Sequence, residues 1–264
     1  MKEFFGFDGF QRPAEGFLSW QHITFVTADM AVMVALALFF GHRNKNKDIK
    51  SKNKVLVFAA ILINAVEIFK NVLFCIVERS PFDWLYSLPL FLCSIQFITI
   101  PLAAFSKGRV KEASLDFVFI FGMLGAILGT YCAGNNYSVY PVLCFTNVVS
   151  AITHGTAGFC ALYIHLAKMV SIKRSNCHFT FAILFSFCIA AYIANLFLST
   201  NYMFLMRGDG TPYDIIYNLV NGNPVLYPLL VVVLFIVYII VFYYVFYHIK
   251  NAKNKNGAPP QGKS

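Results

Sequence analysis

The sequence predicts an all-α, polytopic membrane protein built as a bundle of seven transmembrane helices. Of its 264 residues, 58% are hydrophobic and only 12% are charged, whereas soluble domains have about 45–50% and 25%. The apolar excess falls in seven segments, each long enough to cross a hydrocarbon core of about 30 Å. This composition excludes a secreted disulfide scaffold, a nucleic-acid-binding domain and a two-domain soluble enzyme, although the formal net charge is +9.

Short polar connections separate the seven expected spans. Their ranges are 20–41, 55–77, 86–106, 114–133, 143–170, 178–200 and 224–248. We expect residues 1–19 to form an external N-terminal segment, residues 20–248 the seven-helix transmembrane domain, and residues 249–264 a disordered, basic cytoplasmic tail. The segment before the first apolar run contains Glu3, Asp8 and Glu15 and lacks the basic start and the small-residue cleavage site of a signal peptide, so we interpret the run as a spanning helix.

Basic residues divide unequally between alternate loops. The N-terminal segment and the 78–85, 134–141 and 201–223 loops hold four Lys and Arg, whereas the other loops and the C-terminal tail hold sixteen. Because Lys and Arg in short loops stay on the cytoplasmic side, the N-terminus is predicted outside and the C-terminus inside. That arrangement requires an odd number of spans, in agreement with seven. A second role for the basic face is contact with anionic lipid headgroups.

The seven cysteines show no spacing typical of metal ligands, and no metal or cofactor is indicated. Most of them fall inside expected helices, where a thiol packs as a small apolar side chain. Cys132 and Cys144 flank the 134–141 loop, so a disulfide between them stays open as an alternative to two free thiols.

Polar side chains inside the spans indicate a functional site, because an ionisable group at mid-membrane costs about 2.5–3.5 kcal/mol. Helical spacing places Asn64 and Glu67 on one face with Lys70 beside them. The predicted orientation puts these groups in the outer half of the membrane, at one level with polar groups of other helices, five helices in all. We therefore predict an outward-facing polar cavity covered by the 201–223 connection. Its candidate residues are His22, Asp29, Asn64, Glu67, Lys70, Cys93, Gln96, Asn147, His154, Asn195, Asn201 and Tyr202. In the competing interpretation, Glu67 and Lys70 pair with each other, and the Asn and Ser side chains only form hydrogen bonds between helices.

Four elements, in this order, resemble the YwaF-type bacterial integral membrane protein family. They are Leu88-Pro89-Leu90-Phe91-Leu92-Cys93, His154-Gly155, Asn201-Tyr202-Met203-Phe204-Leu205, and Gly222-Asn223-Pro224 with Tyr227. Glu67 and His22 are also similar, and the resemblance spans nearly the whole chain. It implies a location in the plasma membrane of a bacterium.

The sequence departs from that family at Phe91, where the family usually has His, and at Thr153, where it usually has Ser. The Trp-rich end of the family is also reduced here. Whether Phe91 in place of the histidine removes activity stays open.

The YwaF-type family is distantly similar to eukaryotic membrane acyltransferases that move fatty acyl chains between phospholipids with a Cys and a His. Carried over by motif, these residues are Cys93 and His154. The resemblance thus implies an acyl-thioester on Cys93, with His154 accepting the thiol proton. Asn147 or Asn195 would donate to the oxyanion, and Glu67 or Asp29 would orient the imidazole. The implied partners are membrane lipids, as acyl donor and acceptor.

Two other functions stay open. A small-molecule or lipid transporter or binding subunit, without covalent chemistry, is favoured by the intramembrane charges and by the helix-breaking Pro89 and Pro101. Against it, the sequence shows no internal repeat, and only Asp116 and His165 are polar candidates in the cytoplasmic half. An assembly subunit is suggested by the small-residue faces Gly122/Gly125/Gly129 and Gly155/Gly158, which equally serve packing within one chain. The sequence defines neither the substrate nor the oligomeric state.

Overall fold

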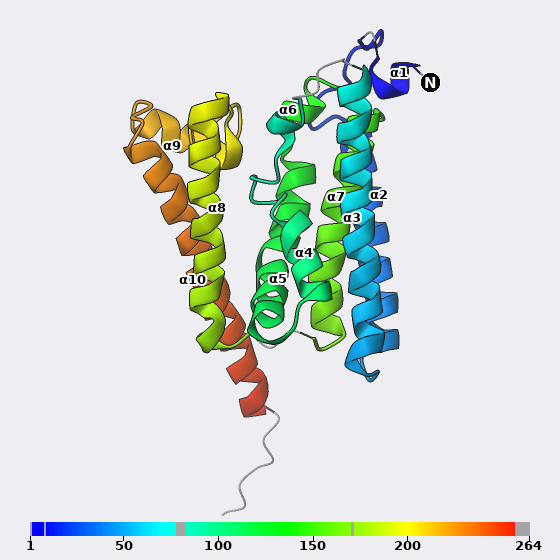
Figure 1. The fold of residues 1–264 in the computed structure, drawn as a ribbon, viewed down its shortest axis with the longest axis vertical. Helices are drawn as coiled ribbons and strands as arrows, with labels where there is room; N and C mark the ends of the chain where they lie inside the picture. Colours follow the sequence, from blue (N-terminus) through cyan, green and yellow to red (C-terminus); the bar gives the residue numbers. More distant parts are fainter. Residues whose placement is uncertain (1, 8, 78–82, 170–171, 257–264) are drawn as a thin grey trace, which may run out of the picture.

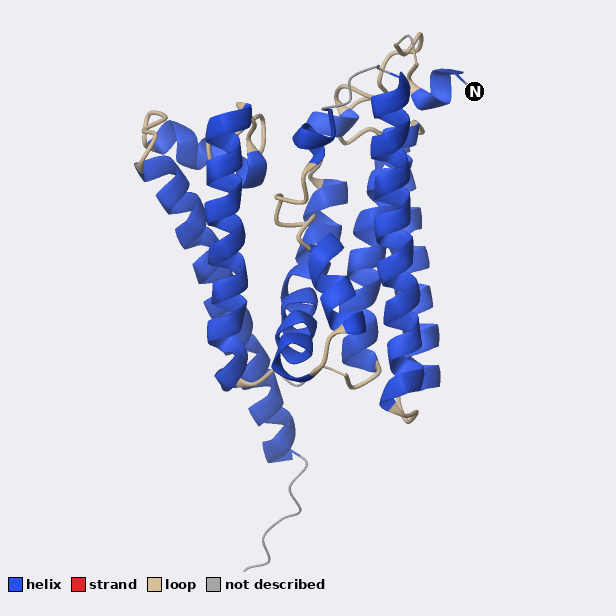
Figure 2. Cartoon of the chain, in the orientation of Figure 1, coloured by secondary structure: helices blue, strands red, loops and turns tan. Residues whose placement is uncertain are grey.

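The computed structural model describes residues 2–7, 9–77, 83–169 and 172–256, and within these ranges the chain forms helices and connections without a strand (Figures 1 and 2). Five helical segments are long and apolar enough to cross a membrane. They are α2 (Trp20–Asn44), α3 (Ile49–Val77), α5 (Gly108–Tyr131) with the short α6 (Gly134–Tyr137), α8 (Cys177–Leu198) and α10 (Leu226–Asn256). The predicted all-α, multi-pass membrane class is confirmed.

Helix α7 (Phe145–Leu166) corresponds to the fifth expected span but is more polar than the five. It carries Asn147, Ser150, Thr153 and His154, which lower its hydropathy. The helix packs against α2, α3 and α5, so most of its surface contacts protein (Figure 1). A helix enclosed in this way tolerates polar groups that a lipid-facing helix would not.

The prediction of one continuous helix over 86–106 is wrong. This region consists of the 3₁₀ turn η1 (Asp83–Ser87), an irregular segment over 88–95, and the ten-residue helix α4 (Gln96–Phe105). Pro89 explains the break, because proline lacks an N–H and disfavours helical dihedrals at Leu88. At about 1.5 Å per residue, α4 alone covers only about half of a hydrocarbon core.

Side chains supply the hydrogen bonds that the broken segment lacks. The hydroxyl of Tyr202, in the turn η3 (Tyr202–Phe204) after α8, accepts the N–H of Leu88 at 3.1 Å and donates to the carbonyl of Leu85 at 2.7 Å. The N–H of Phe91 donates to Ser94 Oγ at 2.9 Å. These bonds matter because irregular backbone at membrane depth has no water to satisfy it.

Several helices extend beyond the apolar segments that predicted them. Helix α3 begins at Ile49 and not at 55, because the carboxylate of Asp48 accepts the Ser51 N–H at 3.2 Å and caps the first turn. Helix α10 continues past 248 to Asn256, and residues 257–264 of the predicted tail lie outside the described residues. Capping and helix propensity, not the membrane boundary, set these ends.

Two apolar clusters hold the bundle together. One fills the space among α3, α4, α5 and α7, with Ile63 and Ile100 at its centre, and the other lies between α5 and the pair α8 and α10, with Phe121 and Leu184. Figure 1 shows α1 (Lys2–Phe5), α6 and α9 (Tyr213–Leu219) at one end of the bundle and the end of α10 at the other.

The segment before α2 is tied to the connection between α6 and α7. Glu15 Oε2 accepts the N–H of Val142 at 2.7 Å, and the Arg12 guanidinium donates to the Leu143 carbonyl at 3.3 Å. Burial alone would raise the pKa of Glu15, but the Val142 N–H and the charge of Arg12 outweigh burial and hold the pKa below its usual value of 4.5. The ionised carboxylate therefore stabilises this contact.

A carboxyl with a lowered pKa contributes stability that is complete above its unfolded pKa and is lost as the pH falls through the folded pKa. We expect the hydrogen-exchange protection of the Val142 amide to decline as the pH falls through the lowered pKa of Glu15, below the usual carboxyl value of 4.5. The Glu15→Ala variant should lose this protection already at neutral pH. Glu112→Ala, which changes a carboxylate paired with Lys173 at the other end of the bundle, is the control. Equal protection of Val142 in both variants would contradict the assignment.

Candidate active site

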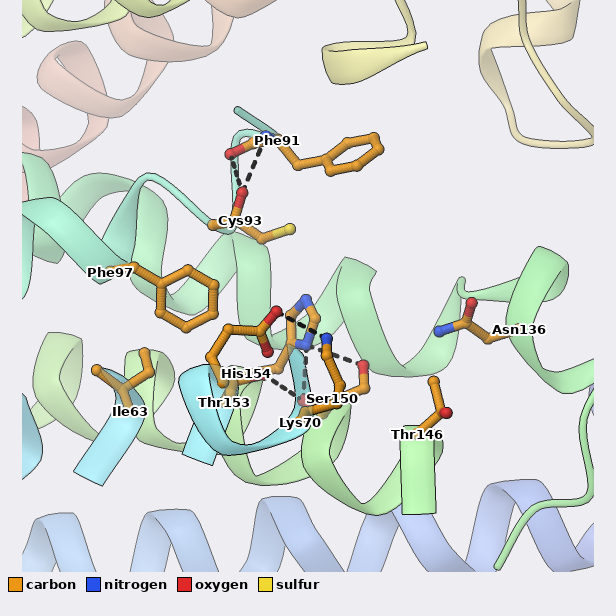
Figure 3. Close-up of a pocket in the computed structure, with 12 residues that line it drawn as sticks. Ile63, Lys70, Phe91, Cys93, Phe97, Asn136, Thr146, Ser150, Thr153 and His154 are labelled. Carbon is orange, nitrogen blue, oxygen red and sulfur yellow. Dashed lines mark hydrogen bonds and ion pairs between the residues drawn. The ribbon is translucent and has the colours of Figure 1, made fainter. Parts of the chain in front are cut away.

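A pocket of about 260 Å³ lies between α3, α4 and α7, at the level of the broken segment (Figure 3). It is slightly smaller than the common range for small-molecule sites, about 300–1,000 Å³. The residues that line it are Ile63, Glu67, Lys70, Phe91, Cys93, Ser94, Phe97, Asn136, Thr146, Ser150, Thr153 and His154. Four of the predicted site residues, Glu67, Lys70, Cys93 and His154, are thus brought together.

Helix α3 contributes an ion pair to the pocket wall. Ile63, Glu67 and Lys70 follow i, i+4, i+7 spacing and so share one face. Lys70 Nζ lies 2.7 Å from Glu67 Oε1, and the two side chains are only 19% and 15% exposed. Because both charges are shielded from water, their attraction is screened less than that of a surface pair.

Helix α7 presents the face that carries Thr146, Ser150 and His154. The Nδ1 atom of His154 donates to the Ser150 carbonyl at 2.8 Å, which fixes the neutral ring with Nε2 unprotonated. Nε2 is buried and no group in the described part of the chain forms a hydrogen bond with it. The Glu67 carboxylate also lies close enough to interact electrostatically with the ring.

Cys93 sits in the turn that begins α4. The backbone N–H groups of Cys93 and Ser94 face its sulfur, and such groups at the start of a helix stabilise negative charge. In Figure 3 the free ring nitrogen of His154 points toward Cys93, and the two side chains interact electrostatically. The arrangement is that of a thiol beside a base.

Several other predicted cavity residues lie outside the pocket lining and join helices instead. His22 is fully buried, donates from Nε2 to the Thr130 carbonyl at 3.0 Å and accepts the Leu18 N–H at 3.1 Å. Asn64 donates to the Phe97 carbonyl at 3.1 Å and so joins α3 to α4. Asn147 donates to the Pro141 carbonyl at 3.0 Å.

Asn195, Asn201 and Tyr202 also shape the backbone and do not line the pocket. Asn195 accepts the Tyr202 N–H at 2.6 Å and donates to the Tyr202 carbonyl at 3.0 Å, which closes the end of α8. Asn201 donates to the Arg207 carbonyl at 2.8 Å. The predicted cover is therefore not observed, because no residue of 201–223 lines the pocket. This connection instead supports the broken segment, with the Tyr202 ring 5.2 Å from that of Phe91.

Asp29 and Gln96 lie next to the pocket with incomplete hydrogen bonding. The carboxylate of Asp29 is packed against Gly155, the residue after His154, and it interacts electrostatically with the imidazole. Gln96 is fully buried and its Oε1 accepts the Thr99 hydroxyl at 3.1 Å. Asp29 Oδ2 and Gln96 Nε2 have no hydrogen-bond partner among the described residues.

Sequence reasoning missed five lining residues, Ile63, Ser94, Phe97, Asn136 and Thr146. Thr146 could have been found, because it lies two turns before the predicted His154 and, at i, i+8 spacing, near the same face of α7. Asn136 had no sequence signal, since it reaches the pocket through the fold of the short α6.

Among the described residues, no group of three His, Cys, Asp or Glu is arranged to hold a metal ion. Cys132 is exposed, Cys144 is buried, and both are free thiols, so the disulfide left open by the sequence is not formed.

The comparison with known families gives one match. A model of the TMEM164 family matches residues 17–247, a range that includes every residue lining the pocket. No curated protein and no solved structure matches the sequence.

Removing the Tyr202 hydroxyl should weaken the broken segment. In Tyr202→Phe the Leu88 N–H and the Leu85 carbonyl lose their partner, and each unsatisfied buried group costs about 1–3 kcal/mol. We expect a lower thermal unfolding temperature in detergent. Tyr244→Phe, on an exposed face of α10, is the control and should leave the unfolding temperature unchanged. Equal unfolding temperatures for the two variants would refute this role of Tyr202.

Proposed function

This chain belongs to the TMEM164 family of membrane proteins, and we propose that it transfers acyl groups between lipids through a thioester on Cys93, with His154 as the general base. The observation that carries the proposal is the buried, unpartnered Nε2 of His154 pointing toward the Cys93 thiol (Figure 3). The YwaF-type resemblance and its similarity to phospholipid acyltransferases support the same pair of residues.

We also propose the predicted topology of seven passes, with the N-terminus outside. Besides the five apolar helices, the two further passes would be the enclosed α7 and the broken segment with α4. The positions of α1, α6 and α9 at one end of the bundle agree with the alternation of loops that the charge count requires. The resemblance to YwaF-type proteins implies the plasma membrane of a bacterium.

In the first chemical step, Nε2 of His154 takes the thiol proton and the Cys93 sulfur attacks the ester carbonyl of a lipid. The bond between the acyl carbon and the lipid oxygen breaks, and His154 gives its proton to that oxygen. The products are an acyl-thioester on Cys93 and a lipid with a free hydroxyl.

In the second step, a hydroxyl or amine of the acceptor gives its proton to His154 and attacks the thioester carbonyl. The carbon–sulfur bond breaks and the Cys93 thiolate recovers the proton from His154. The pocket of about 260 Å³ accommodates the reacting groups, while the acyl chains can remain in the apolar surroundings of the helices.

The developing oxyanion requires hydrogen-bond donors. Asn147 and Asn195 are poorly suited, because neither lines the pocket and each already donates one amide hydrogen to a backbone carbonyl. The N–H groups of Cys93 and Ser94, at the start of α4, are better placed. Glu67 lies within electrostatic reach of the His154 ring and stabilises the imidazolium that forms during proton transfer.

The transport alternative has less support. All the pocket-lining residues come from α3, the 91–94 turn, α4, α6 and α7, and none comes from α8 or α10. Asp116, at the other end of α5, accepts a hydrogen bond from Asn176 at 3.0 Å and joins α5 to the turn before α8. These contacts favour a pocket for chemistry over a polar path through the bundle.

Replacing either member of the pair should abolish acyl transfer. In vesicles of phosphatidylcholine with an isotope-labelled acyl chain and a lysophospholipid acceptor, we expect Cys93→Ala to be inactive and His154→Gln to lose activity by about 10²–10⁴-fold. Mass spectrometry should find the labelled acyl group on Cys93 of the unaltered protein. Cys132→Ala, at an exposed free thiol, is the control. Full activity of a folded Cys93→Ala protein would exclude the thioester mechanism.

The topology has a direct test. An epitope placed before Met1 should be accessible from outside intact cells, and one placed after Ser264 should be accessible only after permeabilisation. Accessibility of both epitopes in intact cells would require an even number of passes and would contradict seven.

A further inference from the structure

Two glycines of α5, one helical turn apart, contact the two side chains of the proposed catalytic pair. A Cβ atom added at Gly125 would lie 3.4 Å from Cβ of Cys93. A Cβ atom added at Gly129 would overlap the imidazole of His154, with Nε2 and Cδ2 as the nearest atoms. Spacing of i, i+4 puts both glycines on the same face of α5.

The contact at Gly129 restricts the imidazole from the side opposite its hydrogen bond. Nδ1 is held by the Ser150 carbonyl at 2.8 Å on α7, and the ring edge that includes Nε2 rests against α5. The ring therefore has little freedom to turn, and Nε2 stays directed at Cys93 (Figure 3). The same contact excludes water from Nε2, which is buried without a partner.

The neighbouring glycine on α5 has a different environment. A Cβ atom at Gly122 would meet the Ala157 carbonyl oxygen at 2.7 Å and the Ala161 side chain at 3.0 Å. Gly122 thus permits close packing of α5 against the backbone of α7, as small residues in membrane helices commonly do. Gly125 and Gly129 differ from it, because they face the side chains of Cys93 and His154.

We propose that Gly129 is a positioning residue that holds the His154 imidazole in reacting geometry with the Cys93 thiol, whereas Gly125 makes only ordinary contact with Cys93. This inference rests on the proposed function and extends it to a third helix. Glycine is required at 129 because any larger residue would displace the base from the thiol.

The test measures the reactivity of Cys93 and so needs no lipid substrate. The rate of Cys93 alkylation by iodoacetamide is followed by mass spectrometry of its peptide, as a function of pH, in the purified full-length protein. Because the thiolate is the reactive form, His154→Gln should slow alkylation near neutral pH by about tenfold or more. Gly129→Ala should slow it by a similar factor. Gly134→Ala, whose added Cβ would find ordinary contact at 3.6 Å from Phe17, is the matched control and should react like the unaltered protein.

A double variant separates positioning from a general effect on the fold. If Gly129 acts through the imidazole, Gly129→Ala should cause no further slowing in a His154→Gln background. If the Gly129→Ala protein does not fold, the double variant Gly129→Ala with His154→Ala is made. We expect this double variant to fold, because the methyl group at 129 occupies the space that the imidazole leaves. A double variant that still fails to fold, or equal slowing in both backgrounds, would overturn the positioning role.

The remaining outcomes distinguish the two proposals. If His154→Gln slows alkylation and a folded Gly129→Ala does not, the positioning role is refuted and the catalytic pair stands. If His154→Gln leaves the alkylation rate unchanged, the pair itself is refuted, and the positioning role with it.

Discussion

The need to satisfy backbone polar groups where no water is present governs the centre of this structure. The chain is broken at Pro89, and the freed N–H and carbonyl groups are bonded by Tyr202 and Ser94. Tyr202 is held in turn by Asn195, which closes the end of α8. The region around α8 thereby becomes part of the support for a site to which it contributes no lining residue.

The break also gives Cys93 its chemical surroundings. In a continuous helix, the N–H groups near the sulfur would be used in hydrogen bonds to earlier carbonyls. At the start of a short helix they remain available to a negatively charged sulfur or oxyanion. The polar α7 can stand beside this turn because α2, α3 and α5 enclose it. The proposed chemistry therefore depends on a helix break and on a helix shielded from lipid.

The sequence predicted the features that follow from composition and periodicity. Apolar segments predicted the long helices, and a motif resemblance pointed to Cys93 and His154, which the structure places on the wall of one pocket. Prediction from the sequence failed where hydrogen bonds to nearby backbone groups decide the place of a polar side chain. Polar residues such as His22, Asn147 and Asn195 were assigned to a cavity, but each bonds to backbone at or near a helix end. Periodicity shows which face of a helix a residue occupies. It does not show whether a nearby backbone carbonyl will accept a hydrogen bond from the side chain.

Features that oppose stability converge near the proposed site. Glycine inside a helix is less favourable than alanine by about 1 kcal/mol, and Gly125 and Gly129 both lie where α5 meets the side chains of Cys93 and His154. His154 Nε2 and Asp29 Oδ2 are buried without hydrogen bonds from the described residues, and each such group costs about 1–3 kcal/mol. A region selected only for packing would have alanine at 129 and an apolar side chain at 154. The coincidence of a proline break, two glycines and unpaired polar atoms is typical of sites where geometry is maintained at the expense of stability.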